Sequence, residues 1–367
     1  MTITQLPSPH EIKSFFPLRP KASSFIEQAR KTAKRIIQGE SSRKALIIGP
    51  CSIHDRKSAI EYAKRFRELS QAVKRTCFLV MRVYVEKPRT STGWKGLLYD
   101  PHLDGSYDIR TGLLWTRELL LTLAEMQIPA ATEFVDPLAS LYFEDLITWG
   151  FIGARTSSSQ PHRQFASSRT MPIGFKNSTD GNLENPIHGV LSAMSAHTSM
   201  HIDDHGKLCA IQGKGNPFSH IVLRGAYKFT NYDPASIQQA GCLLEQAGLP
   251  ARLMIDCSHG NCQKNHEKQH DVFISILKQI QEGNDKIFGL MLESHLEGGS
   301  QTMSDELQYA VSITDPCLDW KATEELVYSA DAALSSTPAD AALSSTPAGA
   351  ALSSAPAGAA LSSAEVF

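Results

Sequence analysis

The segment ALIIGPCSIHD, residues 45–55, joins an uninterrupted apolar run to Gly-Pro, and a cysteine and a histidine follow three residues apart. A continuous run of β-branched and aliphatic residues is typical of a strand that is covered on both faces. Most strands end in ordinary turn residues, but this one ends in two of the most reactive side chains found in proteins. The segment therefore predicts a buried strand that carries Cys51 and His54 at its carboxyl end.

Seven more apolar runs of the same kind follow, separated by helical patterns that are clearest at 111–127, 233–249 and 270–283. The runs are CFLVMRVY (77–84), PAATEF (129–134), GFIGART (150–156), MPIGFKN (171–177), SHIVLRG (219–225), RLMIDCSH (252–259) and IFGLMLES (287–294). Regular alternation of strand and helix predicts an α/β fold whose parallel sheet closes as a (β/α)8 TIM barrel. The alternative is an open doubly wound sheet, but no GxGxxG pattern follows the first strand.

Three segments do not fit the rhythm of the barrel, which we place at 41–329. Residues 1–40 precede the first strand and are predicted to form an N-terminal extension. Residues 196–217 suggest a polar β-hairpin, with its turn at DDHGK, inserted before the sixth barrel strand. Residues 330–367 repeat a nine-residue unit, DAALSSTPA, rich in Ala, Ser and Pro. Such a segment buries too little apolar surface to fold alone, so we expect a flexible, low-complexity tail.

The composition excludes several classes of protein. With 42% hydrophobic residues the chain can bury a sizeable core, and its net charge of −2 favours neither nucleic acid nor a membrane as partner. The sequence has no apolar stretch of about eighteen residues and no signal-peptide pattern. Its seven cysteines are odd in number and scattered, which suits reduced thiols. We therefore expect a cytoplasmic protein.

Residues typical of metal ligands gather in one sector of the predicted barrel. In this fold the active site lies at the carboxyl ends of the strands, and closure makes the seventh, eighth and first strands neighbours. The residues at or shortly beyond those ends are Cys51, His259, Glu293 and Asp315. Sulfur, nitrogen and oxygen ligands together suit one divalent ion, such as manganese, iron, cobalt, zinc or copper, rather than calcium or magnesium. Each residue alone has an ordinary explanation in packing or capping, but their shared position favours a metal site.

Two other interpretations of the cysteines stay open. Cys51 is alternatively a nucleophile with His54 as its base, although the sequence has no dedicated signal for the oxyanion hole that this chemistry needs. Cys257 and Cys262 lie five residues apart but lack further ligand partners, so ordinary packing is the preferred explanation for them.

Basic residues follow the strands that face the metal sector. They are Arg82, Lys87, Arg89, Lys95, Arg155, Lys176 and Arg224. Arginine forks and lysine ammonium groups hold phosphate and carboxylate, so this cationic rim predicts a substrate or substrates with more than one anionic group. Glu133 adds a carboxylate among the cations, where it can orient water or move a proton.

Seven motifs, in this order and spacing, resemble one enzyme family. They are GPCSIHD, KPRTSTGWKGL, GARTSSSQ, GFKNSTDG, IDCSHGN, ESHLEGG and SITDPC. The chain resembles the type I, amino-acid-regulated, metal-dependent 3-deoxy-D-arabino-heptulosonate 7-phosphate (DAHP) synthases over about residues 10–325. The resemblance implies a condensation of phosphoenolpyruvate with erythrose 4-phosphate and water that yields DAHP and phosphate. This reaction is the first step of the shikimate pathway to the aromatic amino acids.

The resemblance also implies roles for individual residues. Cys51, His259, Glu293 and Asp315 would bind one divalent metal. Arg82, Arg155, Arg224, Lys87 and Lys176 would hold phosphoenolpyruvate, and Lys87, Pro88, Arg89 and Thr90 would receive erythrose 4-phosphate. Lys87, Glu133 and Lys176 are the residues expected to take part in catalysis. We further expect feedback inhibition by Tyr, Phe or Trp, and a homodimer or homotetramer formed through the N-terminal extension.

Some alternatives compete with this activity. A related synthase condenses phosphoenolpyruvate with arabinose 5-phosphate, but its loop typically reads KANR where this chain has KPRT. A non-catalytic metal-binding barrel would have no need to keep all the ligands and cations. An aldolase with a Schiff base on Lys176 would leave the Cys-His-Glu-Asp set unexplained.

One departure from the family is RGAYKFTNY, with Ala226 in place of a second glycine, which leaves the geometry of that loop open.

Overall fold

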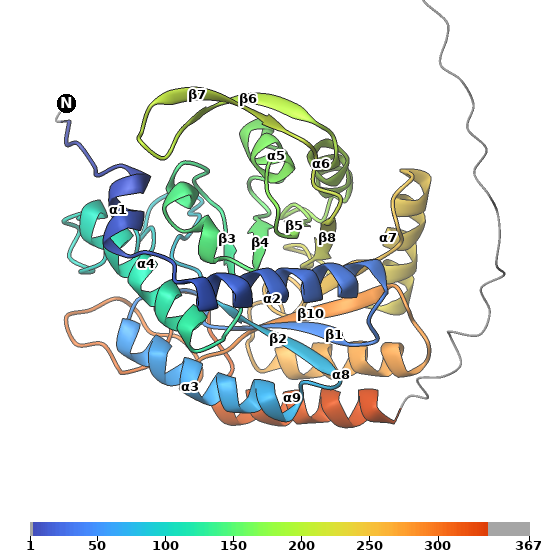
Figure 1. Ribbon diagram of the computed structural model, residues 1–367. Coiled ribbons are helices and arrows are strands. Elements are labelled where there is room, and N and C mark those ends of the chain that lie inside the picture. Colours follow the sequence, from blue (N-terminus) through green and yellow to red (C-terminus); the bar gives the residue numbers. More distant parts are fainter. Residues whose placement is uncertain (1–2, 337–367) are drawn as a thin grey trace, which may run out of the picture.

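A computed structural model describes residues 3–336 of the chain. Eight parallel strands form a closed barrel in the order β1-β10-β9-β8-β5-β4-β3-β2 (Figure 1). The strands are β1 (Lys44–Gly49), β2 (Cys77–Arg82), β3 (Ala130–Glu133), β4 (Trp149–Ile152), β5 (Ile173–Lys176), β8 (Ser219–Leu223), β9 (Leu253–Asp256) and β10 (Ile287–Glu293). Each lies within one of the predicted apolar runs, or at most one residue beyond it, so the predicted (β/α)8 barrel is confirmed.

Helices cover the outside of the barrel and precede it. They are α1 (Pro9–Phe15), α2 (Pro20–Gln38), α3 (Arg56–Ala72), α4 (Ile109–Glu125), α5 (Gln160–Ser167), α6 (Glu184–Met194), α7 (Pro234–Gln246), α8 (Lys268–Gln281) and α9 (Trp320–Ser335), with the 3-10 turns η1 (Ala139–Tyr142) and η2 (Glu144–Leu146) after β3. Four of the helices begin after an aspartate whose carboxylate accepts a hydrogen bond from a first-turn N–H: Asp55, Asp108, Asp233 and Asp319. Such caps satisfy backbone donors that the helix itself leaves unpaired.

The amino-terminal half of the barrel interior is filled with large apolar side chains. The rings of Trp149 on β4 and Phe288 on β10 lie 6.2 Å apart, although their strands are not neighbours in the sheet, so they meet across the barrel axis. Phe151 and His220 complete this layer of rings. These rings fill the interior at the amino-terminal end. Space for inward-facing charged side chains is therefore left at the carboxyl ends of the strands, where the active site of such a barrel is expected.

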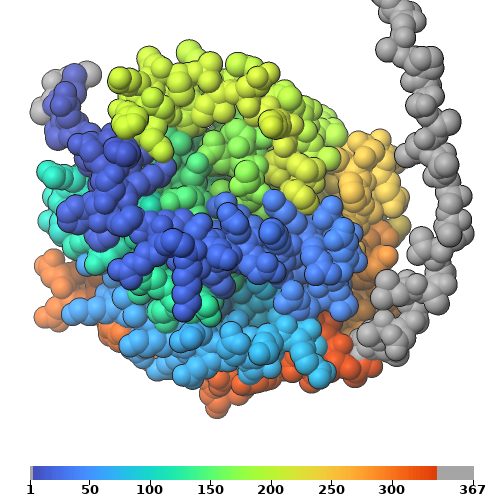
Figure 2. Space-filling model, viewed as in Figure 1, coloured from blue at the N-terminus to red at the C-terminus, as the bar shows by residue number. Residues whose placement is uncertain are grey.

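The inserted hairpin is confirmed before the sixth barrel strand. Strands β6 (His197–Ile202) and β7 (Leu208–Gly213) pair in antiparallel fashion around the predicted turn. Helix α1 packs against that turn, because the His10 N–H donates to the Asp204 carbonyl and Lys13 Nζ lies 2.8 Å from the Asp204 carboxylate. Figure 2 shows the hairpin and the N-terminal segment meeting on the surface, although they are far apart in the sequence.

The predicted start of the tail at residue 330 needs correction. Helix α9 continues to Ser335, so the first residues of the repeat are helical. Alanine and leucine favour helix, Val327 and Ala330 are buried, and the Thr76 hydroxyl donates to the Asp331 carboxylate. The rest of the predicted tail, 337–367, lies outside the described residues. Within 3–336, no helix is both long and apolar enough to cross a membrane.

Candidate active site

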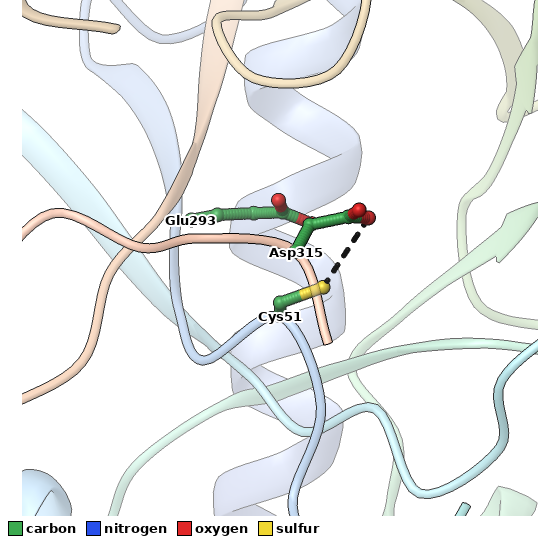
Figure 3. Close-up of side chains that lie close together, drawn as sticks. All are labelled: Cys51, Glu293 and Asp315. Atoms are coloured by element: carbon green, nitrogen blue, oxygen red, sulfur yellow. Dashed lines mark hydrogen bonds between the residues drawn. The ribbon is translucent and has the colours of Figure 1, made fainter. Parts of the chain in front are cut away.

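Three of the four predicted metal ligands converge at the carboxyl end of the barrel. Gly49 of β1 pairs with Glu293 of β10, so Cys51, two residues after Gly49, lies near that glutamate. Asp315 lies on the loop after β10, and ligand atoms of Cys51, Glu293 and Asp315 all lie within 4.8 Å of one another. Figure 3 shows the Cys51 thiol pointing to the Asp315 carboxylate, at 3.6 Å. Thiolate and carboxylate donors in such a cluster can hold a divalent transition metal.

The fourth predicted ligand, His259, lies beside this group rather than within it. Its Nε2 is 3.6 Å from Glu293 Oε1, and its Nδ1 is 2.9 Å from Asp256 Oδ2. A carboxylate on one ring nitrogen fixes the orientation of the imidazole and leaves the other nitrogen for a metal. His259 is thus oriented toward the cluster by a residue that the sequence analysis missed. The signal for Asp256 was an acidic residue inside the apolar run LMIDC.

Burial and neighbouring charges set the protonation of the cluster. Burial raises the pKa of Cys51 to about 12, with Glu293 adding to the effect and Lys87 opposing it. A thiol in this setting becomes a thiolate ligand only when a cation replaces its proton. Partial burial raises the pKa of Asp315, but the charges of Lys87 and His259 outweigh it and the pKa lies below its ordinary value. The Lys87 ammonium lies 3.1 Å from the Cys51 sulfur.

A cavity of about 310 Å³ opens above the cluster and collects most of the predicted site residues. Those that line it are Lys87, Pro88, Arg89, Thr90, Glu133, Arg155, Lys176, Arg224, His259, Glu293 and Asp315. Among the charged residues of this lining, arginine and lysine outnumber the carboxylates Glu133, Glu293 and Asp315, so the cavity suits a ligand with several negative charges.

Known proteins match this chain in both sequence and fold. The DAHP synthetase I family matches residues 20–328. The chain belongs to this family. It is 46% identical to a Tyr-sensitive phospho-2-dehydro-3-deoxyheptonate aldolase of Escherichia coli (strain K12), over 88% of the chain and 91% of that protein. It is 43% identical to the Trp-sensitive enzyme of the same strain, over 91% of the chain and 96% of that protein.

A solved structure resembles the whole barrel. The phospho-2-dehydro-3-deoxyheptonate aldolase from Francisella tularensis SCHU S4 superposes with a TM-score of 0.89 at 39% identity, covering 91% of this chain and 98% of that one. The predicted resemblance to the DAHP synthases is therefore confirmed at the level of family and fold.

In this member of the DAHP synthetase I family, Arg82 is buried and does not join the predicted cations that line the cavity. It does not line the cavity: its side chain is 0% exposed, and one guanidinium nitrogen, Nη2, lies 2.9 Å from Glu293 Oε1. The Tyr84 ring lies 4.0 Å from the guanidinium carbon. The other terminal nitrogen of Arg82 and the Tyr84 hydroxyl are buried without a hydrogen-bond partner among the described residues. Two such orphaned donors beside a cavity indicate that a bound ligand or water completes the site.

Lys176 and Glu133 form a charged group across the cavity floor. Lys176 Nζ lies 3.2 Å from Asp256 and 3.9 Å from Glu133. Burial raises the pKa of Asp256, but His259 and Lys176 outweigh it and hold the pKa well below the ordinary range. Gly153 leaves room for Glu133, because a Cβ at that position would lie 2.2 Å from Glu133 Oε1.

The loop after β2 carries Lys87 to Thr90 over the cavity. The Lys87 N–H donates to the Lys95 carbonyl, and Arg155 Nε donates to the Thr90 hydroxyl at 3.1 Å. The side chain of Lys95, a predicted cation, does not line the cavity. The lining residues that the sequence analysis missed are Tyr84, Ser91, Thr92, Ala154, Thr179, Tyr227, Cys262, Lys264 and Pro316. Most follow a predicted strand end closely, but hydroxyl and small residues there carry no signal of their own.

The alternative pairing of Cys51 with His54 is not supported by the geometry. The thiol contacts Asp315 and Lys87, whereas His54 lines a separate cavity beside α3. Burial lowers the pKa of His54. Cys257 and Cys262 are buried free thiols.

Proposed function

We propose that this chain condenses phosphoenolpyruvate with erythrose 4-phosphate and water to give DAHP and phosphate, the first step of aromatic amino acid biosynthesis. The observation that carries the proposal is the position of the Cys51, Glu293 and Asp315 cluster directly beneath a cavity lined with arginine and lysine. The two substrates bring two phosphates, a carboxylate and an aldehyde, which are the groups that such a site can bind.

The cations hold the substrates in reacting geometry. Arg155, Arg224 and Lys176 bind the phosphate and carboxylate of phosphoenolpyruvate, supported from below by Arg82. The Lys87–Thr90 loop receives erythrose 4-phosphate, and Arg89 binds its phosphate. Binding both substrates side by side in a fixed orientation avoids the entropy cost of bringing them together from solution, which lowers the activation free energy of the condensation.

A divalent metal fits the donor set of this chain. Cys51, Glu293 and Asp315 would hold it, with His259 as the fourth ligand oriented by Asp256. The bound ion would supply Lewis-acid polarisation of the aldehyde oxygen of erythrose 4-phosphate. A bound metal would also explain why a thiol and two carboxylates lie together beside the cations Lys87 and Arg82.

The residues of the chain manage charge and protons during the reaction. C3 of phosphoenolpyruvate forms the new bond to the aldehyde carbon with the electron pair of its double bond, and positive charge develops at C2. The π pair of the aldehyde moves to its oxygen, which takes up a proton to become a hydroxyl. Water adds at C2, where Glu133, oriented by Lys176, accepts a proton from it, and this proton replaces the one taken up by the aldehyde oxygen. The C2–O bond to phosphate then breaks as the new hydroxyl becomes the C2 carbonyl, and the hydroxyl proton leaves with the phosphate, which Arg155 and Arg224 stabilise.

We extend the proposal to regulation and assembly. The relatives are named as Tyr-sensitive and Trp-sensitive, which supports feedback control by an aromatic amino acid. A dimer or tetramer formed through the N-terminal extension is part of the same proposal, and sedimentation of the purified chain measures it. All seven cysteines are free, which supports a reducing, cytoplasmic location.

The first experiment measures consumption of phosphoenolpyruvate by the purified chain with erythrose 4-phosphate, and separately with arabinose 5-phosphate, each with and without a chelator. We expect consumption with erythrose 4-phosphate alone, loss of it with the chelator, and recovery when a divalent metal is returned. Consumption with arabinose 5-phosphate would favour the related synthase, and no turnover by folded, metal-loaded protein would favour a non-catalytic barrel. Tyr, Phe and Trp added singly then identify the effector.

A further inference from the structure

A second cavity of about 330 Å³ lies at the opposite end of the barrel, between helices α6 and α7 and over strand β8. Its walls are mainly apolar and include Ile37, Val190, Ile221, Leu244 and Leu249. It lies at the amino-terminal ends of the strands, because its residue Ser219 begins β8 and its residue Arg252 directly precedes β9. No residue lining it also lines the active-site cavity.

A buried hydroxyl without a partner lies in the floor of this cavity. Ser219 is 8% exposed, and its hydroxyl oxygen makes no hydrogen bond within the described residues. The next residue, His220, packs among the rings of Trp149 and Phe288 inside the barrel. Because side chains alternate along a strand, Ser219 and Ile221 face outward, between α6 and α7. A buried, unsatisfied hydroxyl is costly, and a ligand that hydrogen-bonds to it removes that cost.

A cation without a carboxylate partner lies in the same cavity. The Arg252 guanidinium donates to the carbonyls of Ile36 and Ile37 at the end of α2 and to the carbonyl of Asp285, which leaves one N–H on each terminal nitrogen for a ligand. No carboxylate of the described residues lies within ion-pair distance of it. The nearby rim residue Glu40 lies 3.8 Å from Arg35 instead. Arg252 therefore has no ion-pair partner among the described residues, and the Asp285 carboxylate acts on its charge only from beyond ion-pair distance.

We propose that this cavity binds a small monocarboxylate whose apolar body has the size of a single ring or a branched alkyl chain. The carboxylate accepts hydrogen bonds from the Ser219 hydroxyl and the Arg252 guanidinium, which lie at the starts of adjacent strands. The apolar body fills the space between Val190 and Leu244. The volume matches that of pockets for small organic ligands, which combine apolar walls with a few placed polar groups. This site is separate from the proposed catalytic function and does not depend on it.

Calorimetric titration with phenylacetate tests the proposal on the full-length protein. Phosphoenolpyruvate is kept at saturation, so that the cationic active site cannot take up the probe. We expect saturable binding at one site per chain. Phenylacetamide, which has the same body without the charge, should bind about tenfold more weakly, because charged hydrogen bonds are the stronger ones.

Two variants distinguish the site from nonspecific binding. Ser219→Ala should weaken phenylacetate binding by about fivefold or more. Arg252→Gln should abolish the preference for the acid over the amide. Ser329→Ala, which removes a hydroxyl from the exposed face of α9, serves as the control and should bind as the unaltered chain does. If Arg252→Gln does not fold, Ser219→Ala alone decides.

Three results would overturn the proposal. They are an absence of saturable binding by folded protein, equal affinity in Ser219→Ala, and an acid preference that survives in Arg252→Gln. Because the readout is binding and not turnover, these results are independent of whether the chain condenses phosphoenolpyruvate with an aldose.

Discussion

The Asp256 carboxylate shows how one buried residue organises a site without lining it. It is 0% exposed, contacts His259 Nδ1 and Lys176 Nζ, and belongs to the floor rather than the wall of the active-site cavity. It therefore orients one predicted metal ligand and one predicted catalytic cation at once. Residues in this position act through the groups they hold.

Asp256→Asn should weaken metal affinity by about 10–100-fold, because the amide fixes the His259 ring less firmly and lowers its basicity. The measurement is a titration of metal-free protein with manganese or zinc, followed by activity against metal concentration. Asp271→Asn is the matched control, since that aspartate also neighbours a histidine, His270, but on the exposed face of α8. Equal metal affinity in Asp256→Asn and the control would refute the positioning role.

Glu86 gives the protein a specific dependence on pH. Burial and the nearby Asp136 carboxylate raise its pKa from 4.5 to about 8, although the Val135 and Asp136 N–H groups donate to it. The folded state therefore keeps its proton while the unfolded chain loses it. The stabilisation is complete below about pH 4.5, declines as pH rises, and is lost once pH passes about 8.

Glu86→Gln mimics the protonated form and should escape this loss. Between about pH 5.5 and 8.5, the free energy of unfolding of the unaltered chain should fall relative to that of the variant by at least about 1 kcal/mol. Urea unfolding at both pH values measures it, with the exposed Glu325→Gln as control. A constant difference between the two pH values would show that Glu86 ionises in the folded state as it does in the unfolded one.

At the scale of elements, helix α4 fixes the substrate loop by close contact of two backbones. The loop after β2 is closed by hydrogen bonds from Lys87 N–H to the Lys95 carbonyl and from Leu98 N–H to the Val85 carbonyl. A Cβ on Gly112 of α4 would lie 2.0 Å from the Leu98 carbonyl oxygen. Glycine is therefore required there, because only its small size allows the helix to approach the loop this closely.

Gly112→Ala should lower the free energy of unfolding by at least about 2 kcal/mol, because neither backbone can move aside without distortion. Gly241→Ala on α7 is the matched comparison, since its new methyl group would come too close only to the flexible end of Lys286 and would make ordinary contact with Ala251. That variant should be neutral or more stable by up to about 1 kcal/mol, as expected from helix propensity. Urea unfolding compares the two, and equal losses would contradict this account of the loop.

At the scale of the whole molecule, the cluster of Cys51, Glu293 and Asp315 connects the first and last strands of the barrel. β1 and β10 are far apart in sequence and close the barrel by pairing Ala45–Gly49 with Gly289–Glu293. Cys51 follows the first strand, whereas Glu293 ends the last strand and Asp315 lies on the loop after it. An ion held by all three would cross-link this closure.

Metal at about 100 times its dissociation constant should therefore stabilise the chain by about 2.7 kcal/mol, and a chelator should remove the effect. Thermal unfolding with and without zinc or manganese measures the shift in melting temperature. Cys51→Ala should lose the shift, whereas Cys242→Ala, which changes a cysteine on α7, should keep it. A full shift in Cys51→Ala would exclude that thiol as a ligand.

The sequence by itself determined the eight strands, the hairpin and the family, because burial on both faces imposes continuous apolar runs and the motifs stand at their carboxyl ends. It also identified Cys51, Glu293 and Asp315, since parallel strands bring their ends to one edge. Only the tertiary structure decided that Arg82 lies beneath the cavity, that Asp256 orients His259, and that Ser219 lies unpaired at the opposite end. These facts depend on contacts between residues distant in sequence, whose distances follow from how the closed barrel packs and not from any local pattern.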